Sequence, residues 1–120
     1  IARRRFLARR YDQALVNLPL ATPVEAPEVK SAAHLYIVRL DEVRHDRQRI
    51  FAGLRARGIG VNVHYIPVHT QPYYQQLGFR RGDFPEAERF YQRIMTLPLY
   101  PDLDDAAQLT VIESLRELLT

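Results

Sequence analysis

The chain has 120 residues, of which 47% are hydrophobic and 26% are charged. This length suits one domain with its own core, and this composition excludes a disordered chain. Cysteine is absent, which excludes disulfides and thiolate metal sites. No apolar run approaches the roughly 20 residues of a membrane span, so we expect no membrane contact. The formal net charge is +3, and Lys30 is the only lysine among 17 lysines and arginines.

Residues 2–18 carry an amphipathic helical pattern. Apolar residues recur at helical spacing, namely Leu7, Tyr11, Leu15 and Leu18 with Phe6 and Ala14 beside them, and the other face holds Arg3, Arg4, Arg5, Arg9 and Arg10. The arginines leave two interpretations open. Either they bind nucleic acid, which would make the chain a stand-alone basic interaction module, or they form a solvated face or an interface with sequence outside this chain. Because the chain opens at Ile1 within the helical pattern, we interpret it as a piece of a longer protein.

The next elements are a connector, a strand, a helix and a second strand. Residues 19–33 contain three prolines and no periodicity, which predicts an extended connector. Residues 34–40 are rich in β-branched and aromatic side chains and predict a buried strand. A helix over residues 45–57 is expected to bury Ile50, Phe51 and Leu54, with Val43 just before it, His45 at its solvated start and Gly58 as its stop. A second strand is predicted from residue 59 to residue 64 or 65.

The second half of the chain predicts three more helical segments and one extended piece. A short turn is expected over residues 73–77, closed by Gly78. Asp83 and Glu86 have the spacing of a capping box, which predicts a helix from Pro85 to about residue 95. That helix should bury Ala87, Phe90 and Ile94. Residues 96–101 should be extended at a sheet edge. The last helix should be capped by Asp104 or by Asp105 with Gln108, and it should bury Leu109, Ile112, Leu115 and Leu119. The sum is one α+β domain over residues 1–120, a small antiparallel or mixed sheet with helices over one face.

Residues 58–74 change from a β-branched run to a segment rich in His, Tyr and Gln, broken by two prolines. Such a change is typical of a buried strand that runs out into a loop displaying polar groups. The side chains of His64, Tyr65, His69, Gln71 and Tyr73 suit hydrogen bonding to an anionic or hydroxylated ligand. The alternative is a structural role, in which His64 and Tyr65 end a strand and bond to backbone groups. The residues alone favour neither the ligand-binding role nor the structural role. Tyr73 is more often a core residue than a stacking platform.

The sequence offers no complete catalytic site. His64 and His69 lie five residues apart across a proline, without a neighbouring carboxylate, so we expect no metal site. There is no glycine-rich phosphate loop, nucleophile elbow or Cys/His pair, and we therefore assign no catalytic residue.

Several short motifs together resemble a known family. They are HLY at 34–36, GIGVNVHYIPVH at 58–69, QPYY at 71–74, LG at 77–78, DFPEAE at 83–88 and LPLYP at 97–101. They resemble the C-terminal portion of the pyridoxal-phosphate (PLP)-dependent nucleotide-sugar aminotransferases of the DegT/DnrJ/EryC/StrS type, over nearly the whole chain. Within that family the chain is most similar to the transaminase of pseudaminic acid synthesis, which aminates a UDP-linked 4-keto-6-deoxy sugar.

The resemblance implies a fold-type I enzyme that acts in polysaccharide biosynthesis. It also implies that the enzyme is a cytoplasmic homodimer. The large N-terminal domain of that enzyme would supply the Schiff-base lysine and most of the PLP pocket. This chain would be the small domain, inactive alone, and Lys30 does not match the family's lysine motif. The resemblance also implies glutamate as the amino donor. It places His64, Tyr65 and His69 as sugar or diphosphate contacts, with Gln71 and Tyr73 as further contacts, and it carries over no cofactor-binding residue.

Overall fold

The computed structural model describes residues 1–41 and 46–120. Its elements, in order, are α1 (Ala2–Leu15), β1 (Leu20–Ala21), β2 (Tyr36–Leu40), α2 (Arg47–Ala56), the 3-10 helix η1 (Val68–Thr70), α3 (Pro72–Gln76), α4 (Pro85–Arg93), β3 (Ile94–Leu97) and α5 (Asp105–Leu119). These elements confirm the predicted α+β class. The predicted positions of Val43 and His45, before the second helix, lie outside the described residues.

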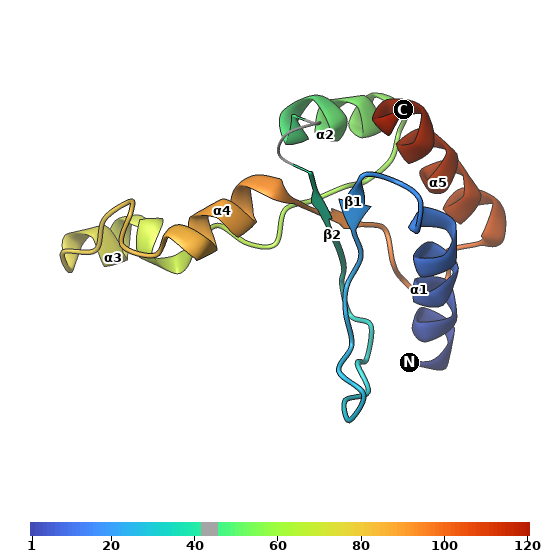
Figure 1. Ribbon diagram of the computed structural model, residues 1–120, viewed down its shortest axis with the longest axis horizontal. Coiled ribbons are helices and arrows are strands. Elements are labelled where there is room, and N and C mark those ends of the chain that lie inside the picture. The colour runs from blue at the N-terminus through green and yellow to red at the C-terminus, as the bar shows by residue number, and fades with distance from the viewer. Residues whose placement is uncertain (42–45) are drawn as a thin grey trace.

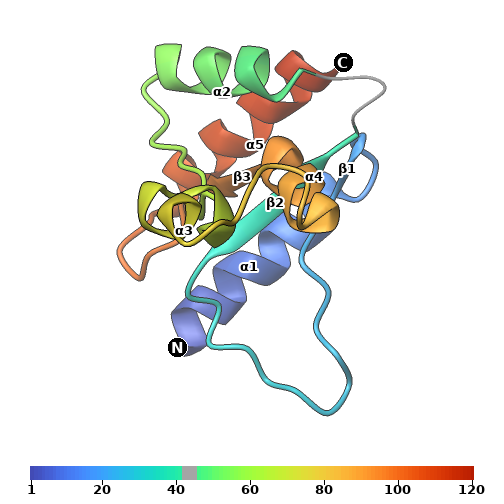
Figure 2. The same ribbon diagram turned by 90° about the vertical axis from the view of Figure 1, so that its left-hand side faces the viewer.

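The three strands form one antiparallel sheet in the order β1-β2-β3, with helices α1 and α5 on one side of it (Figures 1 and 2). In β2 the residues Tyr36, Val38 and Leu40 are buried while Arg39 between them is exposed. This alternation is expected of a strand with one covered face. The covering side chains include Leu7, Tyr11 and Leu15 of α1, which confirms the predicted apolar face of the first helix.

The predicted connector contains a strand that the sequence does not reveal. Leu20 pairs with Leu40, and Ala21 pairs with Arg39. Two residues are too few to show an alternating pattern, so this edge strand has no periodic signal of its own. The prediction that residues 19–33 are extended throughout was therefore incomplete at its beginning.

The predicted second strand, over residues 59–64 or 65, was wrong. Only Asn62 pairs, through reciprocal backbone hydrogen bonds with Thr96 of 2.8 and 3.2 Å. The next antiparallel pair toward the sheet interior would join Gly60 to Pro98, and Pro98 has no N–H to donate. One bridge therefore replaces a ladder, and the chain leaves the sheet after it.

Of the predicted helix caps, the one at Asp83 was wrong, and of the two alternatives for the last helix one is confirmed. The carboxylate of Asp83 accepts from the backbone N–H of Arg80 at 2.8 Å and so closes the turn before α4, whose N-cap is Phe84. Asp104, not Asp105, caps α5, by accepting from the N–H of Ala107 at 2.7 Å.

Gln108 and two hydrophobic residues also differ from their predicted places. Gln108 is fully buried and donates to the carbonyl of Leu7 at 2.7 Å, so it completes no capping box. Phe90 and Leu109 are 45% exposed. Helix α4 ends at Arg93 and buries none of its residues, because Ile94 and Met95 belong to β3.

Residues 63–93, which include η1, α3 and α4, form an arm that projects from the body of the molecule (Figure 1). The chain as a whole measures 47 × 34 × 24 Å, and every residue from 71 to 87 is exposed. The C-terminal end of the arm returns to the sheet, where α4 lies beside β2 and leads into β3 (Figures 1 and 2). The arm carries all five residues that the sequence predicts as contacts.

Candidate functional site

His64 stands at the root of the arm, two residues after the bridge to β3. Its Nδ1 lies 2.9 Å from the hydroxyl oxygen of Thr96, and its ring meets the ring of Tyr65 edge-on with centroids 4.7 Å apart. The peptide bond between His64 and Tyr65 is cis. Because Nδ1 is engaged, Nε2 is the ring nitrogen left to meet a ligand.

The other predicted contacts divide into exposed and buried residues. Tyr65 is 70% exposed and Tyr73 is 65% exposed, and Gln71 is exposed at the start of α3. Tyr73 therefore does not belong to a core, contrary to the commoner role of such a residue. These three side chains present phenol and amide groups along one projecting segment.

His69 is buried, and its Nε2 lies 2.7 Å from Oε1 of Glu88 on α4. The same Oε1 accepts from the backbone N–H of Gly82 at 2.6 Å. The hydrogen bond from His69, and next the one from Gly82, hold the pKa of the Glu88 carboxyl below its ordinary value. One carboxylate thus joins η1, the turn before α4 and α4 itself, and it occupies the Nε2 of His69.

Two hollows lie along the arm. One, of about 410 Å³, is mainly apolar and is lined by Pro67, Val68, His69, Tyr74, Phe79, Phe84 and Ala87. The other, of about 220 Å³, is lined by Ile66, Pro67, Thr70, Arg81, Glu88, Tyr91 and Gln92. Of the predicted contacts, only His69 lines either hollow, and the remaining four line neither.

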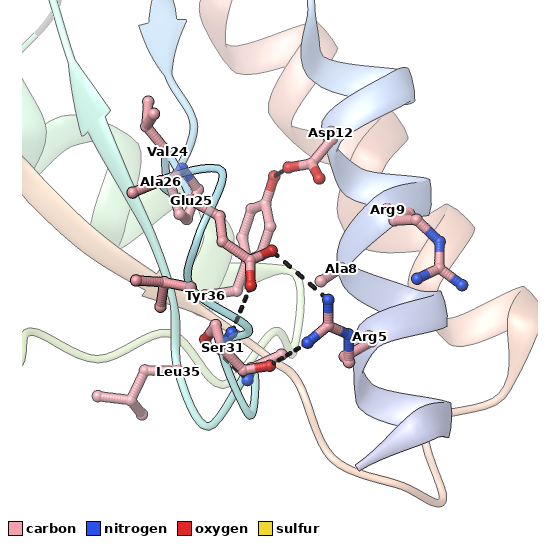
Figure 3. A pocket seen from close by; sticks show the side chains of 13 residues that line it. Arg5, Ala8, Arg9, Asp12, Val24, Glu25, Ala26, Ser31, Leu35 and Tyr36 are labelled. Atoms are coloured by element: carbon pink, nitrogen blue, oxygen red, sulfur yellow. Dashed lines mark hydrogen bonds and ion pairs between the residues drawn. The ribbon is translucent and has the colours of Figure 1, made fainter.

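A further cavity, of about 400 Å³, lies between α1 and the connector, away from the arm (Figure 3). Several of its polar groups bond to one another: Arg5 donates to the carbonyl of Ser31 at 2.8 Å, and Tyr36 donates to Asp12 at 2.6 Å. Burial, and then the hydrogen bond to Asp12, raise the pKa of Tyr36 above its ordinary value. Glu25 completes the lining by pairing with Arg5 and accepting from the N–H of Ser31. None of the predicted contacts lines this cavity, so it is not the predicted site.

The arginines of α1 hold the helix to the rest of the domain. Arg3 donates to the carbonyl of Leu103 at 2.9 Å, Arg4 donates to the carbonyls of His34 and Leu99 at 2.9 and 3.0 Å, and Arg10 pairs with Asp105 at 2.6 Å. Arg5 bonds to the carbonyl of Ser31 at the cavity. Of the five arginines of α1, Arg9 therefore is the one without a hydrogen bond or ion pair to the rest of the domain in the part of the chain that the structure describes. The cluster is therefore no free basic face, and the nucleic-acid interpretation loses the observation behind it.

Two other features bear on what the site can do. Over residues 1–41 and 46–120, no group of three His, Asp or Glu side chains could hold a metal ion, and no helix is long and apolar enough to cross a membrane. Lys30 is exposed in the connector, which extends from the body in a different direction from the arm (Figures 1 and 2). The described residues thus place no amine beside His64.

Sequence reasoning missed the two residues that fix the imidazoles, Thr96 and Glu88. They lie 32 and 19 residues from their histidine partners. Thr96 follows a helical pattern and Glu88 sits inside one, so neither has a local signal that points to a histidine.

Comparison with known proteins identifies the family. The model of the DegT/DnrJ/EryC1/StrS aminotransferase family matches residues 1–116. The spore coat polysaccharide biosynthesis protein SpsC of Bacillus subtilis (strain 168) is 40% identical over 97% of this chain, which covers 31% of that protein. The chain thus spans about a third of the length of such relatives.

Solved structures agree with this assignment. Spr1654 of Streptococcus pneumoniae, named as a sugar aminotransferase, has a TM-score of 0.90 with 32% identity over 98% of this chain and 30% of its own. PseC of Helicobacter pylori, an aminotransferase involved in pseudaminic acid biosynthesis, has a TM-score of 0.87 with 27% identity over 98% of this chain and 32% of its own. The chain belongs to the DegT/DnrJ/EryC1/StrS aminotransferase family.

Proposed function

We propose that this chain is the small, substrate-side domain of a PLP-dependent aminotransferase. The enzyme would transfer an amino group from glutamate to a UDP-linked 4-keto-6-deoxy sugar, in the biosynthesis of nucleotide sugars such as pseudaminic acid precursors. Family membership over residues 1–116 carries this proposal. It is supported by SpsC and PseC, whose names refer to polysaccharide and pseudaminic acid biosynthesis.

The arm would meet the sugar nucleotide. Nε2 of His64, the hydroxyl of Tyr65, the amide of Gln71 and the hydroxyl of Tyr73 are groups that bond to phosphate and sugar oxygens. All four residues belong to the arm, which projects from the body (Figure 1), so a second surface would have room to close over the ligand. His69 would contribute from inside the arm, because its Nε2 is already bonded to Glu88.

PLP, when bound, supplies the chemistry that carries the amino group between donor and acceptor. Its attachment needs a lysine amine, and the single lysine of this chain, Lys30, is exposed in the connector. The residues described here therefore do not form a PLP site. We propose that a larger domain of the same protein supplies the lysine and the cofactor pocket, that the protein is a cytoplasmic homodimer, and that this chain alone is inactive.

The test uses the natural protein that contains this chain. We expect it to bind PLP, with the visible absorbance of the bound cofactor, and to aminate a UDP-linked 4-keto-6-deoxy sugar in the presence of glutamate. His64→Ala should raise the KM for the sugar nucleotide about tenfold or more, as expected when a charge-assisted hydrogen bond is lost, and should leave the cofactor absorbance unchanged.

His34→Ala is the matched control, since His34 is an exposed histidine two residues before β2, outside the arm. Its KM should equal that of the wild type. A natural protein that binds no PLP, or a His64→Ala variant that loses the cofactor absorbance, would contradict the proposal.

A further inference from the structure

Thr96 makes three of the contacts that fix the root of the arm. It is 6% exposed in β3, and its backbone N–H and carbonyl bond to Asn62. Its hydroxyl oxygen lies 2.9 Å from Nδ1 of His64. A single strand residue therefore holds both the last sheet-bonded residue before the arm and the first imidazole of the arm.

The backbone bridge determines where His64 stands, and the hydroxyl determines how its ring is turned. An imidazole on a chain leaving a sheet can rotate about two side-chain bonds, and a ligand contact at one nitrogen benefits when that rotation is already restricted. The edge-on contact with Tyr65 does not restrict the ring strongly, because Tyr65 itself is 70% exposed. The hydroxyl of Thr96 is thus the rigid partner, since it is buried on a paired strand.

The partner of Nδ1 also assigns the ligand to the other ring nitrogen. With Nδ1 bonded to the hydroxyl, Nε2 has no hydrogen-bond partner within residues 1–41 and 46–120. A hydrogen bond at one nitrogen of a histidine sets the orientation and the proton placement of the other. We infer that Thr96 is a positioning residue, which orients His64 so that Nε2 meets an oxygen of the sugar nucleotide. This inference rests on the function proposed above.

The test is the steady-state kinetics of Thr96→Val in the natural protein. Valine keeps the branched shape and removes the hydroxyl, so the backbone pairing with Asn62 and β2 should persist. We expect the KM for the sugar nucleotide to rise about threefold to tenfold, the worth of one hydrogen bond. The KM for glutamate, kcat and the cofactor absorbance should stay unchanged, because the lost contact serves the binding of the sugar nucleotide equally in the ground state and the transition state.

Three companion variants separate positioning from general support of the fold. Thr96→Ser retains the hydroxyl and should restore the KM to near the wild-type value. Thr110→Val removes an exposed hydroxyl on α5 that bonds to the carbonyl of Ala106, and it should leave the KM unchanged. Adding Thr96→Val to His64→Ala should not raise the KM further, because the hydroxyl would then have no imidazole to orient.

A spectroscopic measurement makes the inference independent of turnover. In the natural protein labelled with ¹⁵N-histidine, the Nδ1 resonance of His64, identified by its loss in His64→Ala, should shift in Thr96→Val and return in Thr96→Ser. A Thr96→Val effect that persists undiminished in the His64→Ala background would overturn the inference. So would an unchanged KM in Thr96→Val when His64→Ala alone raises it; if His64→Ala itself has no effect, the proposed role of the arm fails as well.

Discussion

The two histidines of the arm show how far the surroundings of a residue decide its role. His64 and His69 are five positions apart in the arm, yet His64 is half-buried with its Nδ1 on Thr96, whereas His69 is buried with its Nε2 on Glu88. Their residue types predicted polar display for both. The partners that separate them come from a strand and a helix distant in sequence, and this is why the sequence could not distinguish the two.

Gln108 is the clearest polar residue in the core, and its substitution should report on the packing of α1 against α5. Its Nε2 donates to the carbonyl of Leu7, while its Oε1 has no partner among the described atoms. Gln108→Ala should lower the free energy of unfolding by about 2 to 3 kcal/mol, because it loses the bond and leaves a cavity. Gln108→Met keeps the volume and removes the unpaired oxygen, so it should cost about 1 kcal/mol or less. Urea denaturation of the chain measures both, and equal losses in the two variants would contradict this account.

The elements with strong helical periodicity could be predicted from the sequence, and those defined by distant partners could not. Helices α1, α2 and α5 bury apolar residues at the expected spacing, and Gly58 follows the second of them with a φ of 77°. The strand β1 and the bridge at Asn62 depend on where β2 and β3 lie. The candidate site follows the same division, since the sequence indicates its loop but not the residues that orient it.

Within the arm, one carboxylate, that of Glu88, joins three segments of the chain. Neither α3 nor α4 buries a residue, so the bonds of Glu88 to His69 and Gly82 replace the apolar packing that usually fixes a helix. Edge-on ring contacts add to these hydrogen bonds, and the ring centroids of His69 and Phe84 are 4.9 Å apart. Loss of the carboxylate charge should therefore loosen the arm before it affects the body.

Acid should release the arm through Glu88. The pKa of this carboxyl is lowered in the folded chain from an ordinary value of 4.5, so its stabilising contribution is complete above pH 4.5 and is lost as the pH falls through the lower folded value. Hydrogen exchange of amides in residues 68–88, measured from pH 6 downward and corrected for the intrinsic rate, should show this loss. Glu88→Gln should give loosened exchange already at pH 6, with little further change in acid.

Glu86→Gln is the control for that experiment, because Glu86 lies on the same helix but is exposed and pairs only with Arg89 within the described chain. Its exchange profile should follow the wild type. Retention of arm protection in Glu88→Gln would show that the aromatic contacts suffice without the carboxylate.

The molecule as a whole divides into a packed body and an arm that its own body does not cover. The sheet with α1, α2 and α5 contains the buried hydrophobic cluster, whereas the arm exposes half or more of Tyr65, Ile66, Val68, Tyr73 and Leu77. On α1 the apolar stripe is turned into the domain, and only Phe6 of that stripe is exposed, at 43%. Uncovered apolar surface is thus concentrated on the arm, where the proposed enzyme would close over its substrate.

This concentration predicts that the isolated 120-residue chain associates through the arm, because contiguous exposed apolar surface is rarely tolerated by a monomer. Sedimentation velocity should show an average mass that rises with concentration, together with binding of a dye specific for apolar surface. Combining Ile66→Ser with Leu77→Gln should reduce both signals, since these side chains are 52% and 60% exposed on the arm. Leu109→Gln, which alters a leucine 45% exposed on α5, should reduce neither, because it lies on the body. A chain that sediments as a monomer at every concentration and binds no dye would contradict this prediction.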